Sequence, residues 1–374
     1  MLKTLKNKGA KKGETLSEVE DAILVISQKN RVAEMAPIVF RRGERVVEWN
    51  GQKILNTTNI KPIEAADSGD KKNWPFLYKL MTHMFVDNPQ SSLPSVFTFW
   101  AWHKRFYEAI LNSRLDQGHT MVLCGPSKRG KTLLSTMVVA PSVGGFADGS
   151  DYLSGQTKFN KEMGRTACWV IDDTTSASNR QEQMRLTEML KRSTANPRMD
   201  LMPKYGDAIS IPWAGRAMLS LNDDPNSMSV IPNLDSSNRD KIIAFRINPT
   251  PFDFPDKKTL EDTIKKELPY YLAFLKGFKI PDEIKGDDRF GVKSFIDPTL
   301  SDAAYDSSTR ARAAEILDMF SQELRATDPN KKEWRGTFYK LSQDVKTFVG
   351  SIEGRAEDLR RDVTYIEELC NTNK

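Results

Sequence analysis

The stretch Gly125-Pro126-Ser127-Lys128-Arg129-Gly130-Lys131-Thr132 matches the pattern GxxxxGK[ST] along its full length. It follows the apolar run 119–124 and precedes the apolar-faced stretch 131–139, which predict a strand before it and a helix after it. The two glycines allow backbone N–H groups of the loop to converge on an anion, and the start of the helix adds its positive dipole end. The sequence therefore predicts a phosphate-binding loop.

This loop predicts a site for a nucleoside triphosphate. The Lys131 ammonium is expected to meet the β- and γ-phosphates, and the Thr132 hydroxyl is expected to bind Mg²⁺. The expected binding segment consists of Gly125, Pro126, Ser127, Lys128, Arg129, Gly130, Lys131, Thr132 and Leu133. ATP and Mg²⁺ are the expected cofactors.

Two further apolar runs end in polar side chains. The run 168–171 ends in Asp172, expected to hold Mg²⁺ through water, and Asp173, expected to orient or deprotonate the attacking water. A helix N-cap is the alternative role for these acids. The run 217–221 ends in Asn222, expected to hydrogen-bond the lytic water and the γ-phosphate, with an Asx turn as the alternative.

Apolar runs alternate with amphipathic stretches between residues 119 and 250, which predicts an α/β core with a parallel sheet. Strands are expected at 119–125, 165–172, 208–213, 216–222 and 241–247, and a helix at 180–193. Residues 257–278 are expected to form helical segments interrupted by Pro269.

The region before this core has a different character. Residues 1–14 are basic and predict a solvated arm, with weak phosphate contact as the alternative. An amphipathic helix is expected over 15–27, a small β-meander over 37–56 and helices over 74–113. The last stretch has aromatic residues at helical spacing, which is typical of a core, with base stacking as the alternative. These residues are Phe97, Phe99, Trp100, Trp102 and Phe106.

We expect four parts along the chain. They are an N-terminal helical and β region (1–115), which is a candidate oligomerisation collar, an ATPase domain (116–280), a linker (281–308) and a small C-terminal helical or winged-helix-like domain (309–374). Over 310–374 the basic and acidic residues balance, 12 against 12, so an interaction or packing role for the last part is as well supported as DNA binding.

The composition excludes several classes of protein. The 374 residues, 39% hydrophobic and 28% charged, suit a globular protein of two or three domains. No apolar run is long enough for a membrane span, and the lysine-rich start lacks the apolar segment of a signal peptide. Three cysteines and three histidines without metal-like spacing disfavour disulfides and a zinc site. We expect a cytoplasmic protein without a membrane partner. The net charge of +5 permits nucleic-acid binding without establishing it.

The order of these motifs resembles the superfamily 3 helicases, AAA+ ATPases of viruses, phages and plasmids. More narrowly, the chain is similar to the helicase portion of phage and mobile-element primase-helicases, without the primase domain. The resemblance covers roughly residues 50–280 and rests on GPSKRGKT, WVIDD, LSLND and SSNRDKIIAFRI followed by PFDFPD. It implies an ATP-dependent DNA helicase or translocase that forms a homo-hexameric ring on single-stranded or forked DNA during replication of a phage or mobile element. A separate primase or replication initiator is an implied partner.

The resemblance also implies roles for individual residues. Arg239 matches an arginine that reaches the ATP site of the neighbouring subunit, with Arg246 as second candidate and a surface arginine as the alternative. Lys204 and Tyr205 match the position of a hairpin that contacts DNA, with a solvated turn as the alternative. The stretch 332–345 resembles the winged-helix tails of some phage members. An ATPase switch or assembly protein that acts on a protein partner is the alternative function.

Overall fold

The computed structural model describes residues 18–28, 31–87, 91–172, 180–205, 207–223, 239–286, 289–300, 309–327, 334–351, 363, 366–367 and 370. At its centre lies a six-stranded sheet of order β11-β10-β4-β9-β6-β5, in which every neighbouring pair is parallel. Its strands are β4 (Thr120–Cys124), β5 (Phe146–Asp148), β6 (Cys168–Asp172), β9 (Arg216–Leu221), β10 (Ile242–Arg246) and β11 (Phe295–Ile296). The predicted α/β core with a parallel sheet is confirmed.

The strand order places the predicted motifs at one edge of this sheet. Strand β9 lies between β4 and β6, with Cys124 opposite Leu221 and Asp172 opposite Ser220. Because the strands are parallel, the loop after β4 and the polar residues after β6 and β9 meet where the strands end. We call this side the carboxyl edge, and the side where the strands begin the amino edge.

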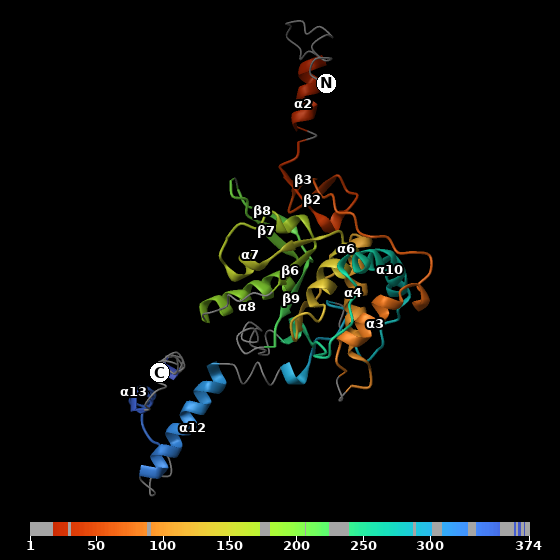
Figure 1. The fold of residues 1–374 in the computed structure, drawn as a ribbon. Coiled ribbons are helices and arrows are strands. Elements are labelled where there is room, and N and C mark those ends of the chain that lie inside the picture. Colours follow the sequence, from red (N-terminus) through yellow and green to blue (C-terminus); the bar gives the residue numbers. More distant parts are fainter. Residues whose placement is uncertain are drawn as a thin grey trace.

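Helices gather on both sides of the sheet (Figure 1). Those on one side are α3 (Pro75–Met84), α4 (Ser95–Leu111) and α10 (Lys257–Gly277), and those on the other are α7 (Ser150–Ser154) and α8 (Arg180–Ala195). After the phosphate loop the chain winds through α5 (Lys131–Leu133), a π-helical stretch η3 (Leu134–Val139) and α6 (Ala140–Ser142) without a break. The predicted aromatic core is confirmed, since Phe99, Trp100, Trp102 and Phe106 are buried and Phe97 packs against the same core.

A small N-terminal sheet differs from the expected meander. Its strands β1 (Glu34–Ala36), β2 (Val46–Trp49) and β3 (Gln52–Asn56) have the order β1-β3-β2. The β2–β3 pair is antiparallel, as a meander requires, but β1 runs parallel to β3. Of the meander predicted over 37–56, only the β2–β3 hairpin is therefore confirmed, because Val39–Arg41 form a 3-10 turn and the third strand, β1, lies before residue 37.

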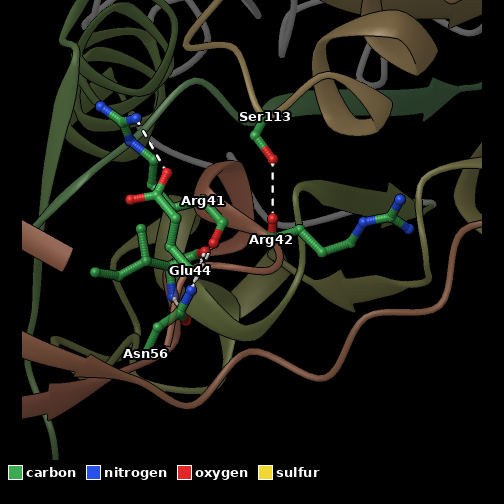
Figure 2. Close-up of polar contacts among 6 residues, drawn as sticks. Arg41, Arg42, Glu44, Asn56 and Ser113 are labelled. Carbon is green, nitrogen blue, oxygen red and sulfur yellow. Dashed lines mark hydrogen bonds and ion pairs between the residues drawn. The ribbon is translucent and has the colours of Figure 1, made fainter. Parts of the chain in front are cut away.

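Asn56 explains this arrangement, because its side chain binds the segment that carries the chain from β1 to β2. Its Oδ1 accepts from the backbone N–H of Ile38 at 2.9 Å, and its Nδ2 donates to the carbonyls of Ile38 at 3.2 Å and Arg41 at 2.9 Å (Figure 2). The Ser113 hydroxyl, just after α4, donates to the carbonyl of Arg42 at 3.2 Å. The crossing segment is thus held against β3 and against the end of α4.

Helix α10 runs through Pro269, so the predicted interruption is wrong. A proline removes one helical N–H, but packing on either side of it holds the helix together, since Leu268 and Tyr271 are buried. The Glu267 carboxylate also accepts from the backbone N–H groups of Phe76 at 3.2 Å and Leu77 at 2.9 Å. These bonds satisfy free N–H groups at the start of α3 and fasten α10 to it.

Buried side chains form two clusters. The larger extends from Ala36 to Leu300, so residues on both sides of the predicted division at 115 and 116 share one core. The smaller joins α12 (Thr309–Thr327), α13 (Phe338–Ser351) and a few later residues. In Figure 1, α12 and α13 lie apart from the sheet, and α2 (Glu18–Gln28) projects on the opposite side. Across the described ranges, no helix combines the length and the apolarity that a membrane crossing requires.

Candidate nucleotide-binding site

The loop between β4 and α5 has the backbone of an anion site. Gly130 precedes the helix with a φ of +86°, and Lys128 also lies in the left-handed region, with a φ of +57°. Left-handed residues among right-handed ones turn successive N–H groups to one side, which forms a concavity for anions. At Gly125 a Cβ would lie 2.9 Å from the Cβ of Ile247, so a larger residue would displace the start of the loop.

Lys131 is positioned by this loop. Its side chain is almost fully buried, and its Nζ donates to the carbonyls of Gly125 at 2.6 Å and Pro126 at 2.8 Å. The same Nζ lies 3.4 Å from Oδ1 of Asn222, at the end of β9. The structure therefore brings together the predicted lysine and the predicted amide at the carboxyl edge.

Thr132 meets Asp172 across the site. The Thr132 hydroxyl lies 2.8 Å from Oδ1 and 2.9 Å from Oδ2 of this exposed carboxylate. A hydroxyl and a carboxylate are the oxygen donors that Mg²⁺ prefers, so this pair fits the ion. Among the described residues, no three or more His, Cys, Asp and Glu side chains are placed so that they could hold a metal ion together, so phosphate oxygens or water would have to complete its ligands. Asp173 lies outside the described residues.

The far end of the helix that follows the loop is held by a buried hydrogen-bond chain. The Ser142 hydroxyl donates to the carbonyl of Val139 at 2.6 Å and accepts from Nε2 of His103 at 2.8 Å, which leaves Nδ1 to accept from the Tyr271 hydroxyl at 3.0 Å. Burial, with a smaller effect of the Arg216 charge, lowers the pKa of His103 to about 3. The imidazole is therefore neutral and joins α4, α6 and α10.

The two candidate arginines lie at opposite edges of the sheet. Arg246 ends β10 beside Cys124, and its Nη1 donates to Thr299 Oγ1 at 3.3 Å. Arg239 is exposed and begins η5 (Arg239–Lys241), just before β10. The five residues of β10, at about 3.3 Å each, separate Arg239 from the loop of its own chain by roughly 15 Å.

Lys204 and Tyr205 lie at the tip of a hairpin. Its strands β7 (Arg198–Leu201) and β8 (Ile209–Pro212) pair antiparallel outside the central sheet. Tyr205 is 85% exposed, and Lys204 Nζ lies 6.0 Å from the centre of its ring. The structure thus presents both side chains to solvent on a projecting element.

Asn160 supports this hairpin and was missed from the sequence. It is buried, its Oδ1 accepts from the N–H of Met202 at 2.6 Å, and its Nδ2 donates to the carbonyl of Asp200 at 3.0 Å. These bonds bring its exposed neighbour Phe159 close to the tip, together with the exposed Lys158 and Lys161. No motif marks this contact, because its partners are about forty residues away along the chain.

Comparisons with known proteins show a likeness of fold. No protein-family model matches this chain, and no curated protein matches it. One structure of the NrS-1 C-terminal region is 13% identical with a TM-score of 0.51, covering 88% of this chain and 71% of that one. A second structure of that region is 12% identical with a TM-score of 0.53, covering 91% and 76%.

A structure described as the active helicase SCCmec type IV Cch is 13% identical with a TM-score of 0.30, covering 95% of this chain and 62% of that one. This similarity is too weak for a structural conclusion. What the comparisons establish is that the chain shares the fold of the NrS-1 C-terminal region.

Proposed function

We propose that the chain is an ATP-dependent DNA helicase or translocase of the superfamily 3, AAA+ type, which works in the replication of a phage or mobile element. The observation that supports this most is the meeting of the loop at 125–132, Asp172 and Asn222 at one edge of a parallel sheet. A projecting hairpin with a basic and an aromatic residue at its tip adds a surface suited to nucleic acid.

In this proposal the residues of one chain bind ATP and prepare its hydrolysis. Loop N–H groups and the Lys131 ammonium hold the phosphates, and Lys131 offsets charge on the terminal phosphate. Thr132 and Asp172 would hold Mg²⁺, which supplies further positive charge to the phosphate oxygens when bound. Asn222, within reach of Lys131, orients the attacking water, and Asp173 is the candidate that accepts its proton.

Arg239 is proposed to complete the site of a neighbouring subunit. Its place at the amino edge, roughly 15 Å from its own phosphate loop, supports action across an interface over action within the chain. Arg246, beside the loop of its own chain, is less suited to that role. A closed ring, for which we propose a homo-hexamer, would give every site such an arginine.

The nucleic-acid surface is proposed to include both the hairpin tip and the adjoining loop. Tyr205 and Phe159 offer exposed rings on which bases of a single strand can stack, and Lys204 supplies charge for the phosphates. Because stacking and phosphate contacts do not read base edges, we expect binding with little sequence preference. Single-stranded or forked DNA is the proposed partner, with priming left to a separate protein.

An ATPase assay with and without single-stranded DNA tests this function. We expect Mg²⁺-dependent turnover that DNA stimulates, and we expect Lys131→Ala to lower it at least about a hundredfold, because transition-state charge loses its cation. Lys265→Ala removes an exposed lysine of α10, outside the phosphate loop, and is the control, expected to retain the turnover. Turnover that ignores DNA, with no strand separation on a forked substrate, would favour an ATPase switch acting on a protein partner.

A further inference from the structure

We propose that the base of the bound nucleotide stacks against Phe252 and Phe254, which we call the aromatic pair, on the side of the phosphate loop away from Asp172 and Asn222. This inference rests on the proposed function, because it concerns the same nucleotide. It adds a base-binding surface to a site that the sequence motifs define only for the phosphates.

The strand order gives the direction in which the nucleotide extends. Strand β4 has β9 and then β6 on one side and β10 on the other. The groups that would hold the terminal phosphate and Mg²⁺, Asn222 and Asp172, both lie at the ends of β9 and β6. A triphosphate with its terminal group on that side directs its sugar and base away from it, toward the chain that leaves β10.

That chain is fixed to the loop and to α3. The N–H of Ile247 donates to the carbonyl of Cys124 at 2.8 Å, and Asn248 donates from its backbone to Met84 at 2.8 Å and from its side chain to His83 at 3.0 Å. From the loop, Arg129 Nε donates to the carbonyl of Pro249 at 2.8 Å. These hydrogen bonds therefore fix the position of residues 247–249 relative to the phosphate loop and to the end of α3.

The aromatic pair follows this segment and reaches the loop. A Cβ added to Gly130 would lie 3.1 Å from Cζ of Phe254 and 3.6 Å from Sδ of Met84. The outer end of the Phe254 ring therefore lies next to the last glycine of the phosphate loop. The centres of Phe252 and Phe254 are 5.0 Å apart, and Phe252 is backed by Phe76 at 5.9 Å.

Both rings pack against the main core and are only partly buried, so part of each ring remains exposed. His83 lies 5.3 Å from Phe252 and is held by the carbonyl of Thr250, 3.1 Å from its Nε2. A planar ring next to a phosphate site gives a flat apolar surface for a nucleobase, and stacking of this kind tolerates any base because each has a π face.

Titration calorimetry of the full chain with Mg²⁺ and either ATP or inorganic tripolyphosphate separates binding of the base from binding of the phosphates. We expect Phe254→Leu to weaken ATP about tenfold and to leave tripolyphosphate within about twofold. Phe254→Tyr restores the ring and is expected to keep ATP within about threefold. Phe97→Leu removes another half-buried ring, which packs against Trp100 and Phe278, and is the matched control.

Equal losses for ATP and tripolyphosphate would overturn the inference, because Phe254 would then only shape the loop. Unchanged ATP affinity in Phe254→Leu and in Phe252→Leu would overturn it as well. Thermal unfolding of each variant shows whether it is folded, and Phe252→Leu, which removes the other ring of the aromatic pair, provides the test if Phe254→Leu is not. The proposed function fails if the wild type binds neither ATP nor tripolyphosphate, or if Lys131→Ala does not abolish their binding. The base surface then fails with it.

Discussion

The carboxyl edge of the sheet and the β7–β8 hairpin are built in opposite ways. At the edge, Lys131 is almost fully buried and its ammonium is bound by two loop carbonyls before any ligand arrives. On the hairpin, Tyr205 is 85% exposed and the tip lies beyond the last paired residues, Leu201 and Ile209. One region fixes charged groups in place, and the other projects side chains from a fixed base.

This difference matches the two tasks in the proposed function. Phosphoryl transfer depends on groups held in place before the reaction, because reorganising them would raise the barrier. A surface that follows a moving strand needs exposed rings and charge that release as readily as they bind. We therefore expect substitutions at the edge to cause large effects on turnover, and substitutions on the hairpin to cause smaller effects on DNA affinity.

The largest effect is expected from Arg239→Ala. We expect ATP turnover to fall about a thousandfold, since an arginine supplied across an interface stabilises charge on the transferred group. Mixing this variant with Lys131→Ala subunits should restore part of the turnover, because some interfaces then pair an intact loop with an intact arginine. Steady-state ATPase of the mixtures measures this.

Arg192→Ala is the matched control for that experiment. Arg192 is an exposed arginine in the last turn of α8, paired with Glu188 at 2.7 Å, and its loss should leave turnover unchanged. No rescue in mixed rings shown to form would falsify the role of Arg239 across the interface. Rescue by Arg246→Ala subunits instead would move that role to the second candidate.

The free energy of unfolding is expected to fall at low pH because of His103, the buried histidine that holds the end of the helix after the phosphate loop. The pKa of His103 is about 3 in the fold and about 6.5 when the chain is unfolded. Above pH 6.5 both states are neutral and the contribution is fully present. Below it only the unfolded chain takes up the proton, so stability should fall by up to about 1.4 kcal/mol per pH unit as pH drops toward 3.

Urea unfolding between pH 7 and 4.5 measures this slope for the wild type and for His103→Gln. The glutamine variant is less stable at pH 7, because the chain from Ser142 to Tyr271 is broken, but its stability should depend less steeply on pH. His83→Gln replaces a half-buried histidine that lies outside the chain from Ser142 to Tyr271, and it is the matched control. An equal slope in all three proteins would contradict the role assigned to His103.

The sequence predicts those parts of the molecule that follow from local patterns, and it does not predict those that depend on contacts between residues far apart along the chain. The loop at 125–132 and the polar ends of β6 and β9 follow from local patterns, and parallel strands bring such ends together in any sheet of this kind. The pairing of β1 with β3 depends on Asn56 binding Ile38, eighteen residues away, which no local pattern shows. The continuous helix through Pro269 likewise depends on buried neighbours and on Glu267 binding the start of α3.

A moderate effect is expected from Lys204→Ala combined with Tyr205→Ala. Loss of one stacking ring and one cation should weaken binding of single-stranded DNA about tenfold and reduce its salt dependence by roughly one phosphate contact. Fluorescence anisotropy of a labelled oligo-dT across a range of salt measures both. Lys265→Ala, an exposed lysine on α10, is the control, and basal ATPase should stay unchanged in both proteins. DNA affinity that survives the double substitution would remove the hairpin from the nucleic-acid surface.

The smallest effect, and the most informative about the hairpin, is expected from Asn160→Ala. The side chain is buried and does not face DNA in the proposal, so any loss of DNA affinity has to pass through its bonds to Met202 and Asp200. We expect a loss of about three- to fivefold, because breaking these bonds costs about 1 kcal/mol. Amide exchange at Met202 should become faster, since its N–H loses an acceptor.

Asn196→Ala, an exposed asparagine just after α8, should change neither quantity. Faster exchange with unchanged DNA affinity would mean that the tip binds without its fixed base, and the hairpin would then differ from the carboxyl edge even more than its contacts indicate.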